Sequence, residues 1–299
     1  MNISPIAFFA YNRPEHTQKS LESLAENKEF KESDLYVFID GPKGKDDREN
    51  IERVKSIIYS RPWCKNLFVQ ENTEHKGCAR QVIEGVSHLF QKSEQVIILE
   101  DDIVVSPHFL SYMNAALEKY ASEQKVMSVT GYLYPIKKIN TDSGFMRLFS
   151  SWGWGTWKRA WKLFQSDAGQ LLERLSNQKM RHEFNCQGSF NYYRMLSRQT
   201  RGEIDSWAIR FYASIFLEGG LTLYPAQALV KNIGFDNSGT NTYKNKRYNT
   251  TLRDLPVENF PEMIEESEEM FLALVDYFRK NHNIFCKVYD RILYFMNKK

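Results

Sequence analysis

Short apolar runs alternate with longer segments of periodically spaced apolar residues in the first part of the chain. The short runs predict strands, and apolar residues that recur every three or four positions predict helices. We expect strands at 6–10, 35–39, 67–70 and 96–99, and helices that begin at Pro14, near Asp46, near Ala79 and at Pro107. Repeated strand–helix units predict an α/β, Rossmann-like fold with a mostly parallel central sheet flanked by helices.

The second part of the chain is less regular. Residues 151–161 contain four of the six tryptophans and two glycines, so part of this segment is expected to be a loop. A helix is predicted from Asp205 to about Leu217, followed by a strand at 221–224. The remaining expectations are a polar loop at 232–250, a linker at 255–261 and two helices within 262–299.

Composition narrows the class of protein. The net charge of +3 is too small to predict nucleic-acid binding. The four cysteines are scattered, which favours a reducing, cytoplasmic location over a disulfide framework or a zinc site. No uncharged apolar run approaches the roughly 18 residues of a membrane-spanning helix. The apolar run at 6–10 predicts a strand and not a signal peptide, so we expect a soluble protein.

Three carboxylates follow the apolar run 96–99 directly. Glu100, Asp101 and Asp102, the acidic trio, would repel one another unless a cation or hydrogen-bond donors compensated their charge. Oxygen ligands suit Mn²⁺ or Mg²⁺, which also bind diphosphate oxygens. The alternative is an acidic turn that faces water. Apolar residues on both sides of the trio disfavour that alternative.

Basic residues and a second strand end are candidates to meet a nucleotide. Arg13, Lys76 and Arg80 could pair with phosphate oxygens. Taken singly, each is more often a solvated surface charge. Asp40 ends the second predicted strand and is a candidate to accept hydrogen bonds from a base or ribose. Its alternative role is to form a turn before Gly41.

Two further features have both a functional and a structural interpretation. Asp205 is a candidate general base, and it is also a suitable N-cap for the helix that follows it. The tryptophans of 151–161 are suited to stack on sugar rings, and equally to fill a core. His75 and His108 have no histidine or cysteine partner at metal-binding spacing, so zinc is not predicted.

The order of these features resembles the GT-A glycosyltransferases, and is most similar to the N-acetylglucosaminyltransferase I group and its bacterial relatives. The resemblance covers about residues 4–240. It is carried by Phe9-Ala10-Tyr11-Asn12-Arg13-Pro14, Ile39-Asp40-Gly41, His75-Lys76-Gly77-Cys78-Ala79-Arg80, the acidic trio, Ser106-Pro107-His108-Phe109, Gly153-Trp154-Gly155, Asp205-Ser206-Trp207 and Asn232-Ile233-Gly234. It implies a catalytic domain over 1–255, with a nucleotide-binding half (about 1–105) and an acceptor half (106–255), before a helical extension (256–299).

The resemblance also implies a role for individual residues. The implied nucleotide-sugar-binding residues are Arg13, Asp40, His75, Arg80, Glu100, Asp101 and Trp154, the implied metal ligand is Asp102, and the implied catalytic base is Asp205. Within this set, Asp40 would lie near the uracil, and Trp154 and its neighbours would shape the sugar or acceptor pocket. The expected cofactor is Mn²⁺, with Mg²⁺ as the alternative ion. The loop at 232–240 is expected to close over the donor.

We therefore expect an inverting, metal-dependent glycosyltransferase that moves a sugar from a UDP-sugar to a glycan or a lipid-linked saccharide, as in polysaccharide biosynthesis. One alternative is a nucleotidyltransferase, although residues 10–14 do not form the glycine-rich basic loop typical of such enzymes. Another is a carbohydrate-binding protein without catalysis. The basic amphipathic segment 284–295 predicts a helix that either contacts the inner face of a membrane or docks on the protein core.

Overall fold

The computed structural model describes residues 2–236 and 247–282. The strands are β1 (Ile6–Ala10), β2 (Asp34–Ile39), β3 (Asn66–Glu71), β4 (Gln95–Glu100), β5 (Ile103–Val105), β6 (Val126–Thr130), β7 (Ser143–Met146), β8 (Trp154–Trp157), β9 (Leu221–Pro225) and β10 (Val230–Asn232). The helices are α1 (Pro14–Ala25), the 3-10 helix η1 (Lys28–Glu32), α2 (Lys45–Ile58), α3 (Cys78–Leu89), α4 (Phe109–Lys119), α5 (Lys158–Trp161), α6 (Ala168–Arg174), α7 (Gln178–Phe184), α8 (Tyr192–Thr200), α9 (Trp207–Leu217) and α10 (Glu268–Asn281).

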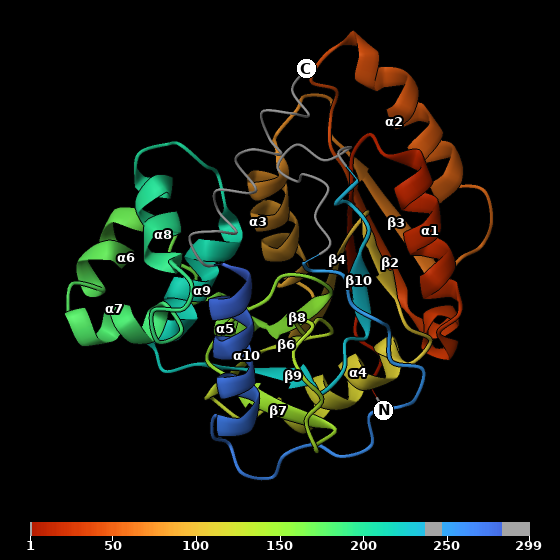
Figure 1. Ribbon diagram of the computed structural model, residues 1–299. Coiled ribbons are helices and arrows are strands. Elements are labelled where there is room, and N and C mark those ends of the chain that lie inside the picture. Colours follow the sequence, from red (N-terminus) through yellow and green to blue (C-terminus); the bar gives the residue numbers. More distant parts are fainter. Residues whose placement is uncertain (1, 237–246, 283–299) are drawn as a thin grey trace.

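A mixed sheet forms the centre of the molecule (Figure 1). In the described residues it has eight strands in the order β3-β2-β1-β4-β8-β6-β9-β7. All of them run in the same direction except β8 and β7, which are antiparallel to their neighbours. The short strands β5 and β10 form a separate antiparallel pair. The predicted α/β fold with a mostly parallel, helix-flanked sheet is confirmed.

The adjacent strands β1 and β4 are apolar and buried because helices cover both faces of the sheet there. In β1, Ile6 and Phe8 belong to one core and Ala7 and Phe9 to another, as the alternation of side chains along a strand requires. The first core also takes in the buried residues of α1, α2 and α4. The second takes in those of α3 and α9, which contact each other across it.

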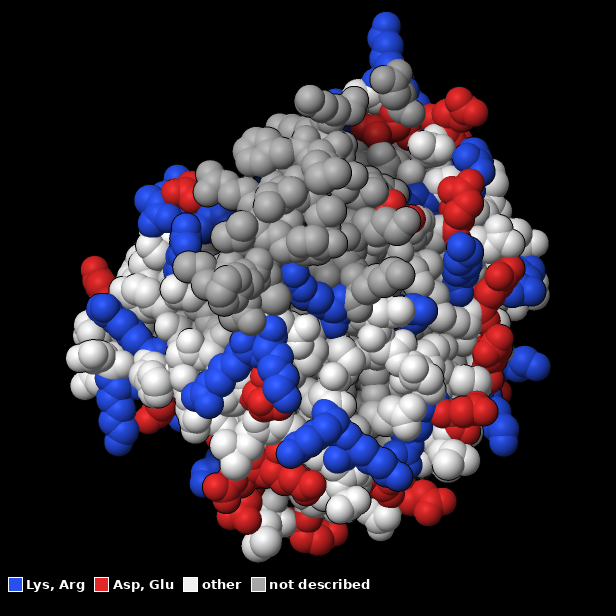
Figure 2. Space-filling view, viewed as in Figure 1, with Lys and Arg blue, Asp and Glu red and all other residues white. Residues whose placement is uncertain are grey.

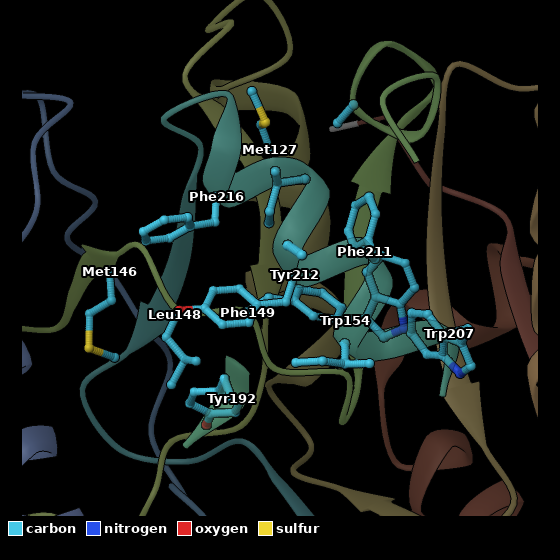
Figure 3. Close-up of a cluster of buried hydrophobic side chains, with 14 of the residues drawn as sticks. Met127, Met146, Leu148, Phe149, Trp154, Tyr192, Trp207, Phe211, Tyr212 and Phe216 are labelled. Atoms are coloured by element: carbon cyan, nitrogen blue, oxygen red, sulfur yellow. The ribbon is translucent and has the colours of Figure 1, made fainter. Parts of the chain in front are cut away.

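The tryptophan-rich segment is in part a loop, as expected, and its remainder forms a strand and a short helix. Residues 151–153 are loop, but Trp154–Trp157 form β8, a central strand between β4 and β6. Gly155 is required there, because an added Cβ would lie only 3.1 Å from the carbonyl oxygen of Val96 on β4. Trp154, Trp157 and Trp161 are buried, and Figure 3 shows Trp154 among other core side chains. For these three tryptophans the core interpretation is confirmed.

Most predicted elements are present with shifted ends. The helix expected near Asp46 begins at Lys45, and the carboxylate of Asp47 accepts the N–H of Gly44 before it at 3.2 Å. The helix expected at Pro107 begins at Phe109, after a turn in which Phe109 N donates to Ser106 O. The pattern did not predict the short elements β5–β7, β10 and α6–α8. Of the two helices expected within 262–299, α10 is present, and the segment 284–295 lies outside the described residues.

Charge is mixed over the surface. Figure 2 shows basic and acidic side chains interspersed over the described part of the visible face, as a net charge of +3 suggests. No helix within the described residues is both long and apolar enough to span a membrane.

Candidate functional site

Three neighbouring strands end at the same edge of the sheet, and polar side chains follow each of them. β1, β2 and β4 are parallel, so the residues after their carboxyl ends converge. Arg13 follows β1, Asp40 follows β2, and the acidic trio starts at the last residue of β4. The structure brings Arg13 together with the trio, and Asp40 together with His75. We call Arg13 and the trio the acidic edge.

Two members of the acidic trio are withdrawn from water, and the third, Glu100, is partly exposed. Asp101 and Asp102 are only 2% and 6% exposed. Burial, reinforced by the two aspartates, raises the pKa of Glu100 to about 8. Burial also raises the pKa of Asp101 to about 6, although Arg13 opposes this shift. Oδ1 of Asp102 is buried without a hydrogen-bond partner in the described structure, which is costly unless another group binds this oxygen.

Arg13 supplies positive charge to the trio. Its guanidinium forms an ion pair with Asp101 and a second, at 3.1 Å, with Oδ2 of Asp102. Tyr11 N donates to Asp101 Oδ2 at 3.2 Å, and Ser20 Oγ on α1 donates to Asp101 O at 2.8 Å. The sequence did not single out Ser20, because a serine inside an amphipathic helix carries no distinguishing pattern.

The segment after β10 covers Asp102. Ile233 N donates to Asp102 O at 2.8 Å. At Gly234 a side chain has no room, because a Cβ there would overlap Oδ2 of Asp102 and would lie 3.0 Å from Nη1 of Arg13. The predicted closing loop, 232–240, therefore begins in contact with the acidic edge, and its residues 237–240 lie outside the described structure.

Asp40 builds the loop beside the acidic edge. Its carboxylate accepts the N–H groups of Gly41, Lys76 and Gly77 at 2.9 Å each, and its Oδ2 lies 2.9 Å from Nδ1 of His75. Asp40 is 2% exposed. In this arrangement Asp40 positions His75, and both of its carboxylate oxygens have partners within the protein. The His75 ring lies 5.0 Å from the ring of Tyr11, measured between centroids.

Lys76 and Arg80 have a different partner from Arg13. Both form ion pairs of 2.6 Å with Glu84 on α3, and the side chain of Arg80 is 68% exposed. The ion pairs of the trio in the described structure are with Arg13. The structure thus joins one of the three predicted phosphate-binding cations to the acidic edge.

A pocket of about 160 Å³ lies at the start of α9. Its aromatic walls are Tyr132, Tyr134, Phe149, Trp152, Tyr192 and Tyr212, and the hydroxyl residues Ser150, Ser151 and Ser206 also line it. We call it the aromatic pocket. These tyrosines come from separate segments of the chain, so sequence spacing gave no signal for it. Aromatic faces beside hydroxyl groups suit a ligand with both apolar and polar surfaces, such as a sugar ring.

Asp205 directly precedes the pocket residue Ser206. Its side chain is 66% exposed and forms an ion pair of 3.0 Å with Arg210. The N-cap of α9 is Ser206, whose Oγ accepts the N–H of Ile209 at 3.4 Å. The interpretation of Asp205 as the helix N-cap is therefore wrong. The carboxylate is left at the surface beside the pocket.

The tryptophan of the pocket is Trp152 and not Trp154. Trp154 is 0% exposed and stacks on Trp207 with ring centroids 5.1 Å apart (Figure 3). It supports the pocket from within the core, whereas Trp152 lines the pocket itself. The Trp152 ring also lies 5.5 Å from that of Phe235, the neighbour of Gly234. Trp152 therefore links the aromatic pocket to the segment that covers Asp102.

The residues of the acidic edge fit a divalent cation of the Mn²⁺ or Mg²⁺ type. Within the described residues, no group of three His, Cys, Asp or Glu side chains could enclose a metal by itself. Asp102 offers a buried carboxylate oxygen that lacks a partner. A hard cation held by one carboxylate would complete its shell with water and ligand phosphate oxygens, as Mg²⁺ commonly does.

No protein-family model matches this chain, and no curated protein matches it significantly. Among solved structures, mouse xyloside xylosyltransferase 1 is 8% identical over 71% of this chain and 80% of its own, with a TM-score of 0.39. S. aureus TarS 1–349, solved with UDP, is 14% identical over 57% and 54%, with a TM-score of 0.37. A 4-diphosphocytidyl-2C-methyl-D-erythritol synthase from Anaerococcus prevotii is 15% identical over 58% and 84%, with a TM-score of 0.33. These likenesses are too distant to carry a functional argument.

Proposed function

We propose that this protein is an inverting glycosyltransferase of the GT-A type that moves a sugar from a UDP-sugar to a glycan or lipid-linked saccharide. One observation carries the proposal. Asp101 and Asp102 of the acidic trio are buried at the carboxyl edge of a mostly parallel sheet, and one oxygen of Asp102 has no partner within the described structure. Buried carboxylates at this edge are expensive to keep unless they serve a bound cation and its ligand.

The donor would bind along the ends of β1, β2 and β4. Asp102 would hold the cation, and Arg13 is within reach of phosphate groups bound there. Mn²⁺ at this position would neutralise the charge of the departing diphosphate. Tyr11 and His75 form a pair of rings, held in place by Asp47 and Asp40 respectively, and such rings offer a surface for a nucleobase.

The acceptor would bind in the aromatic pocket, beside Asp205. The Asp205 carboxylate would take the proton of the acceptor hydroxyl as the acceptor oxygen bonds to the anomeric carbon. The bond between that carbon and the phosphate oxygen breaks, and UDP leaves with the bonding electrons. Support for this role comes from the exposure of Asp205 and from its place next to Ser206 of the pocket wall.

Calorimetric titration of UDP tests the donor site. We expect UDP to bind in the presence of Mn²⁺, to lose most of its affinity in EDTA, and to lose it equally in Asp102→Asn with Mn²⁺ present. The matched control is Asp254→Asn, which removes an exposed carboxylate and should leave UDP binding unchanged. If UDP does not bind under any of these conditions, the proposed donor is wrong.

A further inference from the structure

Arg13 occupies the place where a divalent cation would be attracted. It forms ion pairs with both Asp101 and Asp102, and its side chain is only 19% exposed. We propose that Arg13 is a resident counter-ion of the acidic trio that competes with the metal for Asp102 and is drawn away by the nucleotide diphosphate. Metal and nucleotide then bind cooperatively through Arg13. This inference rests on the proposed function and adds how its two ligands are coupled.

The need for a resident counter-ion follows from the burial of Asp101 and Asp102 next to Glu100. Three adjacent carboxylates in a site of low polarity cannot all be ionised without a compensating positive charge. Arg13 meets this need in the described structure through its two ion pairs. An arginine guanidinium is effectively always protonated in proteins, so Arg13 stays charged.

Competition with the metal follows from the geometry at Asp102. Arg13 Nη1 lies 3.1 Å from Oδ2, and the unpartnered Oδ1 belongs to the same carboxylate. A divalent cation on Oδ1 would thus lie within a few ångströms of the guanidinium, where like charges repel strongly in a site shielded from water. Gly234 packs against the side chains of Arg13 and Asp102. This contact limits how far the guanidinium and the carboxylate can separate while both side chains remain at the acidic edge.

The attachment of Arg13 to the chain permits exchange of partners. Its carbonyl oxygen accepts bonds from the N–H and the Oγ of Thr17, both at 3.0 Å, at the first turn of α1. The backbone is therefore fixed, and the long side chain alone can turn from the carboxylates to another anion. A diphosphate is a suitable one, because guanidinium groups bind phosphate oxygens in a bidentate way.

Reciprocal linkage gives the measurable consequence. A nucleotide that withdraws Arg13 from Asp102 raises the affinity for the metal, and the metal raises the affinity for the nucleotide by the same factor. Without Arg13 the metal meets no competitor, so its affinity in the absence of nucleotide increases. Part of the coupling remains, because phosphate oxygens still contact the metal directly.

The test measures Mn²⁺ binding, both by calorimetry and by loss of the free-ion electron paramagnetic resonance signal, with and without UDP. For Arg13→Gln we expect Mn²⁺ alone to bind about tenfold tighter than in the wild type, UDP alone to bind more weakly, and the UDP-induced gain in Mn²⁺ affinity to shrink. Arg174→Gln, which removes an exposed arginine paired with Glu218, should behave as the wild type. If a folded Arg13→Gln variant binds Mn²⁺ no more tightly than the wild type, the proposal fails.

Removal of a buried ion-pair partner can prevent folding, so Arg13→Lys provides a second test. Lysine keeps the charge but cannot bridge two carboxylates, and we expect Mn²⁺ alone to bind more tightly by a smaller factor. Unchanged Mn²⁺ affinity in this folded variant would also contradict the proposal. The proposed function fails separately, when the wild type binds no UDP with Mn²⁺. Tighter Mn²⁺ binding in Arg13→Gln would support the resident counter-ion even then.

Discussion

At the acidic edge, charged side chains hold one another in place, because Arg13 bridges Asp101 and Asp102. The hydroxyl of Ser20 on α1 and the N–H of Ile233 in the covering segment donate to the carbonyl oxygens of these two aspartates. In the aromatic pocket, contacts between aromatic rings hold the side chains in place. Trp152 contacts Tyr132 with ring centroids 4.4 Å apart, and Phe149 contacts the buried Trp154 at 5.0 Å. The first region is specific in charge and the second in shape. We expect substitutions at the edge to change ligand binding, and substitutions beneath the pocket to change stability.

The largest effect on the reaction rate is expected from substitution of Asp205. This residue is the proposed base that would act between a donor at the acidic edge and an acceptor in the aromatic pocket. In Asp205→Asn the acceptor hydroxyl loses its base, and we expect the rate to fall by about 10²–10⁴-fold while UDP binding with Mn²⁺ is retained. The rate is measured as UDP release from a UDP-sugar found by screening. Glu203→Gln is the matched control, because Glu203 is a nearby acid paired with Arg198 and Arg201. A variant that keeps its full rate would exclude Asp205 as the base.

The next largest effect separates the two tryptophans at the pocket. Trp154 is fully buried, so Trp154→Ala should lower the free energy of unfolding by about 3–5 kcal/mol. Trp152 is partly exposed, so Trp152→Ala should cost clearly less stability and should weaken acceptor binding instead. Urea unfolding of both variants measures the first difference. Equal losses of stability would show that Trp152 also serves the core.

The sequence predicted the acidic edge better than the pocket for a physical reason. An apolar run that stops at three acids defines a strand end, and parallel strands bring such ends together. The edge therefore needed only local patterns, at Arg13, Asp40 and the trio. Local patterns do not show which side chains pair, such as Arg13 with Asp102, or the three contacts by which Asp40 fixes residues 75–77.

The aromatic pocket is formed by residues that lie far apart in the sequence. Local sequence patterns therefore did not predict it. Trp154-Gly155-Thr156-Trp157 has no strand pattern that stands out, yet it forms β8 because β4 and β6 enclose it on both sides. Tyr132, Tyr192 and Tyr212 meet only after α8 and α9 fold against the loop that follows β6. A single position inside β8 also cannot be told from a surface position by its residue type. That is why the sequence did not separate Trp154, which is buried in the core, from its neighbour Trp152, which lines the pocket.

A smaller effect is expected at Gly234, the contact between the covering segment and the acidic edge. A methyl group there would overlap Asp102 Oδ2, and overpacking of this kind costs about 1–3 kcal/mol. Gly234→Ala should therefore weaken UDP binding with Mn²⁺ by about tenfold, as measured by calorimetry. In Gly44→Ala an added Cβ meets nothing within 4 Å, so this control should bind as the wild type. Unchanged affinity in Gly234→Ala would mean that the segment stands away from Asp102 when ligand binds.

The smallest effect distinguishes Asp205 from its neighbour at the start of α9. Ser206 caps the helix, so Ser206→Ala should lower the free energy of unfolding by about 1 kcal/mol. Asp205 is largely exposed and does not cap the helix, so Asp205→Asn should leave stability nearly unchanged in the same urea titration. A loss in Asp205→Asn as large as that in Ser206→Ala would mean that this carboxylate supports the helix. A fall in rate at Asp205 would then no longer identify a base, since the pocket wall at Ser206 would have moved with it.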